Sequence, residues 1–377
     1  MTEKEFDIGP RDLSTSENRF LLNTSEWIAI QSYTSNALNL PTNLDVLRSR
    51  LPAEPPGGMN QFSDLVDAYS NLNRHCKDWN DNTLQDSVNC ASNIVHYNTK
   101  VPIYYGALTK ILPKLEQEPP DEEAIKQFKA ILANLTADAK ANGDHAERVY
   151  NGMKAFAENT EADGKIISAL HGKYQKLFGD QSPDISRISA ELKEDIEELG
   201  KWNKKYEHDV IVAATTPTYC WVWPFGTIAS AIVAGIYGKK ATDALKRVKE
   251  YKAKAKLLSD QLEASASMMA DLEKINIDLN EISDNLNTAL PIIQKMQGIW
   301  NSIESDLLRI QEIIDKDIDQ VPAIIKSLGI DEAIDAWDKV SVEADSYRVN
   351  AFIKVIPEDA AKDAGKAFQK ALNANRS

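Results

Sequence analysis

Apolar residues recur at steps of three and four along most of the chain, which is the period of an amphipathic α-helix. The longest run extends from Leu245 to Ile314, about 105 Å of helix at about 1.5 Å per residue, with a bend predicted at Pro291. Strand-like alternation is not convincing anywhere. Shorter runs predict helices over Phe20–Ala37, Phe62–Trp79, Ile94–Leu112, Ile125–Leu177, Ile185–Tyr206 and Ile330–Tyr347.

Proline and glycine mark where these helices end. Breaks are predicted at Leu40-Pro41, Leu51–Gly58, Glu118–Pro120, Gly179–Pro183 and Leu328-Gly329. Ser14 and Glu17 have the spacing of a capping box, and Ser182-Pro183-Asp184 has the order of an N-cap, an N1 proline and a first-turn acid.

Because each apolar stripe needs a neighbour, these helices predict an all-α fold. We expect an elongated bundle of long antiparallel helices, with about five helices in a tail. Residues 1–200 and 246–377 are assigned to this discontinuous tail bundle. Residues 201–245 are assigned to a small head that carries a hydrophobic hairpin.

The hairpin is predicted in Val210–Gly238, twenty-nine residues without a charge. This length would allow one membrane span, but Pro217, Pro224 and Gly226 divide the segment into two arms, Val210–Thr216 and Thr227–Gly238. A hairpin buried permanently in the core and a constitutive transmembrane anchor are the alternatives. A position at the joint of two long helices favours membrane docking or insertion.

The side chains expected to contact the membrane lie in both arms and in the aromatic turn between them, because Trp and Tyr favour the headgroup boundary. They are Val210, Ile211, Val212, Tyr219, Trp221, Val222, Trp223, Phe225, Ile228, Ile232, Val233, Ile236 and Tyr237. Lysines flank the segment, and Lys204, Lys205, Lys239 and Lys240 form a cationic collar suited to lipid headgroups.

Composition and charge exclude several classes of function. Forty-three basic and 57 acidic side chains give a net charge of -14, which opposes non-specific binding to nucleic acid. The first residues carry acids where a secretory signal needs a basic run, so we expect synthesis in the cytosol without a cleavable signal, then release or secretion toward a host or target membrane. The three cysteines fit buried free thiols better than disulfides or a zinc site.

No catalytic or metal-binding motif is visible. The five histidines lack ligand spacing, and the chain has no GxSxG, P-loop or GxGxxG sequence. Asp315–Asp319 lacks the glycine and distal glutamate of a calcium loop. The sequence therefore predicts a protein without enzymatic activity, cofactor or metal.

A long-helix bundle with an uncharged hairpin between two heptad-like helices resembles the cytolysin A type of α-helical pore-forming toxins. Within that type, the chain is most similar to the A component of xenorhabdolysin-type binary toxins. The residues that carry this resemblance are Tyr33–Thr42 with its Leu40-Pro41-Thr42 ending, Val210–Gly238, and the Trp337 helix after Leu328–Ile330. The resemblance implies a five-helix tail with a head, soluble monomers that assemble on target membranes, and a second protein that completes the pore.

Three functions are compatible with the sequence. The leading hypothesis is a pore-forming toxin component that binds target-cell membrane lipids and oligomerises, alone or with a second toxin subunit. A structural or scaffolding helical bundle with no membrane role is the alternative. A phage or secretion-apparatus rod with a hydrophobic tip is a third hypothesis.

Overall fold

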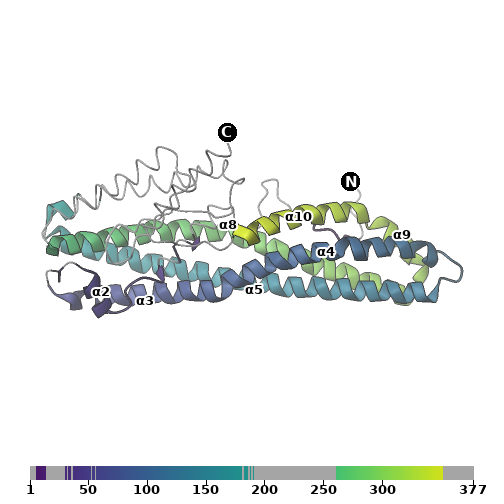
Figure 1. Ribbon diagram of the computed structural model, residues 1–377, viewed down its shortest axis with the longest axis horizontal. Coiled ribbons are helices and arrows are strands. Elements are labelled where there is room, and N and C mark those ends of the chain that lie inside the picture. Colours follow the sequence, from purple (N-terminus) through teal and green to yellow (C-terminus); the bar gives the residue numbers. More distant parts are fainter. Residues whose placement is uncertain are drawn as a thin grey trace, which may run out of the picture. The chain divides into compact units, whose positions relative to one another are not determined.

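The computed structural model describes residues 6–13, 30–180, 182–190 and 260–350, apart from 32, 35, 36, 52, 56, 186, 188 and 189 (Figure 1). Within those residues every regular element is a helix, which confirms the predicted all-α bundle of long helices. The α-helices are α2 (Leu44–Arg50), α3 (Ser63–Asp78), α4 (Leu84–Leu115), α5 (Glu122–Gly179), α8 (Asp260–Lys316), α9 (Val321–Ser327) and α10 (Ile330–Asn350). Short 3-10 turns lie at Arg11–Leu13, Met59–Phe62 and Ile318–Gln320, and a π turn at Trp79–Thr83.

Helix boundaries agree with the predicted breaks. The backbone leaves the helix after Ala37, before Pro41, and the described residues between Leu51 and Gly58 form no helix. At the start of the helix after α5, the Ser182 hydroxyl accepts a hydrogen bond from the Asp184 amide at 3.3 Å, as the predicted N-cap requires. The Ser14–Glu17 capping box lies outside the described residues.

Prolines interrupt the helices less than the sequence suggests. α4 continues through Pro102 and Pro113, and α8 is a single helix through Pro291. A proline inside a helix removes one backbone hydrogen bond and costs about 3 kcal/mol. Side-chain burial along the same helices compensates for that cost, with residues such as Val101 and Ile293 fully buried.

The described chain separates into two compact units. Unit 1 comprises Met1–Asn23, Asn82–Lys154 and Asn287–Ala351. In it α10 packs beside α4 (Figure 1), with contacts between Asn98 and Asp338 and between Ser87 and Tyr347, so the two helices are antiparallel. Three aromatic side chains form the centre of its core, with ring centroids 4.9 Å apart in every pair: Tyr97, Trp300 and Trp337.

Unit 2 comprises Thr24–Asp81, Ala155–Leu286 and Phe352–Ser377. In it α3 packs against the second half of α5. Phe62 at the start of α3 lies 5.3 Å from the Tyr174 ring, and Trp79 at its end lies 4.5 Å from the Phe156 ring. In the first half of α8, the described buried side chains lie on more than one face of the helix, because they include neighbouring positions such as Met268, Met269 and Leu272.

Candidate functional site

The site residues predicted from the sequence lie outside the described residues. This holds for every position from Val210 to Tyr237 in the membrane-contacting set, and for Lys204, Lys205, Lys239 and Lys240. The assignment of residues 201–245 to a head therefore stays a prediction. Among the helices of the described ranges, none is both long and apolar enough to cross a bilayer.

Unit 2 holds the described elements on either side of that segment. α5 ends at Gly179, and α8 begins at Asp260. Both ends belong to unit 2. Unit 2 therefore contains the described helix ends that are nearest to the predicted hairpin in the sequence.

Unit 2 differs from unit 1 in the carboxylates of its core. Four acidic residues in its described part are almost fully buried: Asp163 (4% exposed), Asp271 (0%), Glu273 (3%) and Asp278 (3%). In the described part of unit 1, no aspartate or glutamate is buried to that degree. Burying a carboxylate is costly unless a partner compensates its charge, so the surroundings of these four groups determine how stable unit 2 is.

Asp163 on α5 is held by His75 on α3, with 2.7 Å between Asp163 Oδ2 and His75 Nδ1. The guanidinium of Arg74 lies 2.9 Å from the other ring nitrogen, Nε2. An arginine can only donate, so Nε2 accepts and the proton of a neutral imidazole is on Nδ1, which donates to Asp163. In this arrangement Asp163 is a buried carboxylate whose nearest partner is uncharged.

Burial raises the pKa of Asp163, although His75 and Arg74 oppose the shift. Burial raises the pKa of the Tyr33 hydroxyl and of the Cys76 thiol well above their ordinary values, and the charge of Asp163 adds to both shifts. The predicted free, buried thiol is confirmed for Cys76 and for Cys90. Tyr33 and Cys76 keep their protons across the physiological range, so neither of them adds a charge beside Asp163.

The other buried carboxylates lie on α8. Glu273 Oε2 is 2.6 Å from His171 Nε2 of α5. Burial raises the pKa of Tyr33 and of Tyr69 on α3, and the charges of Asp278 and Asp271, respectively, add to these shifts. The charge of Asp271 also acts on Arg50. Asp271 and Asp278 are seven residues apart, as are Asp278 and the buried Asn285, so these three share one face of the helix.

These residues were missed by the sequence analysis, although one signal was present. The apolar face of the predicted helix over Ile125–Leu177 has a gap between Phe156 and Ile167. Thr160 and Asp163 occupy that face in the gap and are buried. A polar pair inside an apolar stripe indicates a buried polar contact, but its partner, 88 residues away, cannot be read from the pattern.

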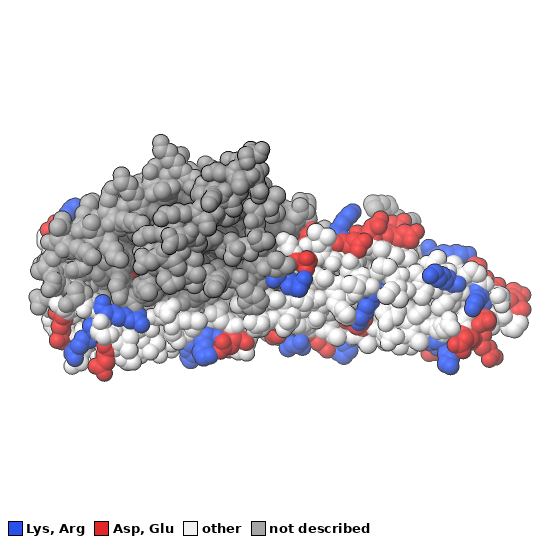
Figure 2. Space-filling model, in the orientation of Figure 1, with Lys and Arg blue, Asp and Glu red and all other residues white. Residues whose placement is uncertain are grey.

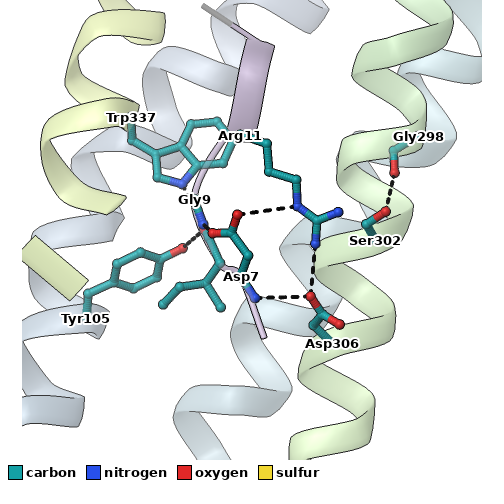
Figure 3. Close-up of polar contacts among 9 residues, drawn as sticks. Asp7, Gly9, Arg11, Tyr105, Gly298, Ser302, Asp306 and Trp337 are labelled. Atoms are coloured by element: carbon teal, nitrogen blue, oxygen red, sulfur yellow. Dashed lines mark hydrogen bonds and ion pairs between the residues drawn. The ribbon is translucent and has the colours of Figure 1, made fainter. Parts of the chain in front are cut away.

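A second polar arrangement lies in unit 1, where residues 6–13 form a strap between α4, α8 and α10 (Figure 3). The Ile8 carbonyl accepts hydrogen bonds from the Tyr105 hydroxyl at 2.6 Å and from Trp337 Nε1 at 3.1 Å. Asp306 accepts from the Asp7 amide at 3.2 Å and from Arg11 at 2.9 Å. The strap thus joins α4 and α10 through the buried donors Tyr105 and Trp337, and it joins α8 through the more exposed Asp306 carboxylate, so its chemistry is structural.

No group of three or more potential metal ligands occurs among the described residues. Neither polar arrangement pairs a nucleophile with a base. Burial keeps the pKa of the Cys76 thiol far above its ordinary value, so Cys76 is not an activated nucleophile.

Known proteins similar to this chain are toxins. Pesticidal crystal protein Cry6Ba of Bacillus thuringiensis is 22% identical over 382 residues, which cover 93% of each chain. Among solved structures, the Bacillus cereus HblL1 toxin component is similar with a TM-score of 0.53 and 14% identity, over 93% of this chain and 99% of that one. Soluble SmhA of the tripartite α-pore-forming toxin Smh, from Serratia marcescens, gives a TM-score of 0.50 and 14% identity, over 95% of this chain and 100% of that one.

The resemblance to α-helical pore-forming toxins of the cytolysin A type is therefore confirmed. The model of the Bacillus haemolytic enterotoxin (HBL) family matches residues 7–201, slightly more than half of the 377 residues. The chain belongs to this family of pore-forming toxins.

Proposed function

We propose that the protein is a non-enzymatic component of an α-helical pore, which acts after release from the producing cell and enters or docks onto a target membrane through Val210–Gly238. The single observation that carries the proposal is this uncharged segment, in a chain of the haemolytic enterotoxin family. Family membership supports pore formation, and the segment supplies the apolar surface that contact with lipid requires.

The described structure supports the proposal by elimination. No described helix is apolar enough to cross a bilayer. The exposed large apolar side chains of the described residues, such as Ile103 and Val342, occur singly. Scattered apolar residues of this kind are normal on a protein surface. Val210–Gly238, which has no charge over its whole length, is the strongest candidate for an apolar membrane contact.

We further propose that a second protein completes the pore. SmhA is one part of a tripartite toxin, and HblL1 is named as a toxin component. By analogy this chain would bind lipid and assemble with itself or with a partner on the membrane surface. A structural bundle without a membrane role would bind no vesicles with or without such a partner.

Ile232→Asp tests the proposal, because Ile232 lies in the second arm and has no charged residue near it in the sequence. An acid at the centre of a membrane segment costs roughly 2.5–3.5 kcal/mol, and each subunit of an oligomer would incur that cost. We expect dye release from liposomes to be abolished while the melting temperature is retained. The measurement is made with and without an HBL-type partner protein.

Ile103→Asp is the matched control. Ile103 is 69% exposed on α4, so the same change in chemistry occurs at a surface position that is not expected to meet lipid. This variant should release dye like the wild type. If Ile232→Asp stays folded and fully active, Ile232 lies outside the membrane and its arm is a packing element.

A further inference from the structure

We propose that unit 2 contains a pH-dependent latch, formed by Asp163 and His75 with Tyr33, Cys76 and Arg74 around them, which is tightest in acid and loosens as the pH rises to neutral. Its consequence for pore formation rests on the proposed function, since unit 2 contains the ends of α5 and α8 that flank the predicted hairpin. The latch itself is a property of the described residues alone.

The contacts of Asp163 explain why this part of the core responds to protons. Asp163 is 4% exposed, and its carboxylate is held by an imidazole whose second nitrogen already accepts from Arg74. With a neutral imidazole, the negative charge is stabilised by hydrogen bonding but not neutralised. A proton taken up by the Asp163–His75 pair, on either group, compensates that buried negative charge.

The direction follows from linkage between proton binding and folding. Burial raises the pKa of Asp163 above its ordinary value of about 3.9, so the folded unit binds this proton more tightly than the opened unit does. The resulting stability is fully present below the ordinary pKa and is lost as the pH rises through the raised pKa of the folded state. Unit 2 should therefore open more readily at neutral pH than in acid.

Titratable and charged groups surround this site and the neighbouring buried carboxylates. Around Asp163 they are Tyr33, Arg74, His75 and Cys76 of α3, and Asp278 of α8. Around the neighbouring carboxylates they are Tyr69, Arg50, Asp271, Glu273 and His171. Asp64 opposes the trend: hydrogen bonds from Lys173 and Tyr174 outweigh burial and lower its pKa. Its pair with Lys173 is half-exposed, so solvent weakens that contribution.

Unit 1 should respond in the opposite direction. Burial is the main cause that lowers the pKa of His145, with Arg148 adding to it and Asp86 opposing it. A lowered histidine pKa contributes stability above the ordinary value of about 6.5, and this stability is lost as the pH falls through the folded value. The two units therefore supply an internal comparison.

Hydrogen–deuterium exchange of the full chain in solution tests the latch without any membrane. After correction for intrinsic exchange rates, protection of α3 and of residues 155–179 should fall about three- to tenfold between about pH 4 and about pH 7. Protection of α4 and α10 should stay the same or rise. Equal slopes in both units, or a rise with pH in unit 2, would overturn the proposal.

Asp163→Asn makes the same test specific to one carboxylate, because the amide keeps the shape and the oxygen that accepts from His75 but does not titrate. We expect this variant to lose the pH slope of unit 2 and to be better protected at neutral pH than the wild type. Glu161→Gln is the matched control, two residues away on α5 with an exposed side chain, and it should keep the slope.

If the Asp163→Asn protein keeps the wild-type pH dependence of protection in unit 2, that dependence arises from other groups and the latch is refuted. If that variant fails to fold, the wild-type protein still tests the latch, because the pH dependence of protection can be compared between its two units. The outcome is independent of the membrane proposal: loss of dye release in Ile232→Asp says nothing about the slope, and a flat slope leaves membrane insertion intact.

Discussion

At the scale of single residues, the Ile8 carbonyl shows how unit 1 fastens its N-terminal strap. Two aromatic donors, Tyr105 and Trp337, converge on one backbone oxygen, and the Tyr97 hydroxyl lies 3.1 Å from the Tyr105 hydroxyl. All three side chains are fully buried. A buried polar group that loses its partner costs about 1–3 kcal/mol, so the strap and the aromatic core depend on each other.

Tyr105→Phe should lower the free energy of unfolding by about 1–2 kcal/mol, because it removes the bond to Ile8 and leaves the Tyr97 hydroxyl without its partner. Urea unfolding followed by circular dichroism measures the change. Tyr104→Phe, at the adjacent half-exposed position, is the control and should stay within about 0.5 kcal/mol of the wild type. A Tyr105→Phe protein as stable as the control would mean that the bond to the strap contributes little.

At the scale of helices, the apolar period predicted the existence and type of most described elements. It located α3 between Phe62 and Trp79, and it located the break at Leu328-Gly329 before α10. A period of three and four is a local property, so one sequence is enough to detect it. Head residues such as Ile232 were also chosen from a local property, the absence of charge, and their role stays a prediction.

The parts that could not be predicted depend on tertiary contacts. α8 was treated as a helix with one apolar stripe, but around Asp271 and Glu273 it is buried on further faces as well. The contact between His75 and Asp163 joins two helices that are 88 residues apart in the chain. Burial of polar faces and pairing over long separations are decided by neighbours, and no window of sequence contains them.

Two glycines in unit 1 predict opposite changes in the free energy of unfolding when each is replaced by alanine. Gly329 has a φ of 61° between α9 and α10, a conformation that costs other residues roughly 1–2 kcal/mol. Gly298 is exposed within α8, and a Cβ added there would meet no atom within 4 Å. The Gly298 carbonyl accepts a hydrogen bond from the Ser302 hydroxyl at 2.9 Å (Figure 3). A substitution at Cα of Gly298 leaves that backbone carbonyl in place.

Gly329→Ala should therefore lower the free energy of unfolding by about 1 kcal/mol, whereas Gly298→Ala should raise it by about 0.5–1 kcal/mol. Urea unfolding of both variants beside the wild type makes the comparison. Each variant serves as the control for the other, because both add one methyl group to unit 1. Changes of the same sign would contradict the assigned roles of the two glycines.

At the scale of the whole molecule, the net charge opposes binding to anionic lipid. The chain carries a net charge of -14. Acidic side chains gather over α10 (Figure 2), where Asp331, Glu332, Asp335 and Asp338 are exposed. If the proposed membrane contact is correct, attraction to anionic lipid has to come from a local cluster of lysines, and the predicted collar is the candidate.

Joint replacement of Lys239 and Lys240 by Gln tests the collar. Each basic residue near an anionic surface contributes about 1 kcal/mol, so binding to phosphatidylserine-containing vesicles should weaken by about 2 kcal/mol, and the wild type should lose affinity as salt is added. The double variant Lys140→Gln and Lys165→Gln removes the same charge from exposed helix positions and separates a local effect from a change in net charge.

Vesicle sedimentation at low and high ionic strength measures the binding of all three proteins. Equal weakening in both double variants would assign the effect to net charge, and unchanged binding in the collar variant would mean that Lys239 and Lys240 only solubilise the end of a helix.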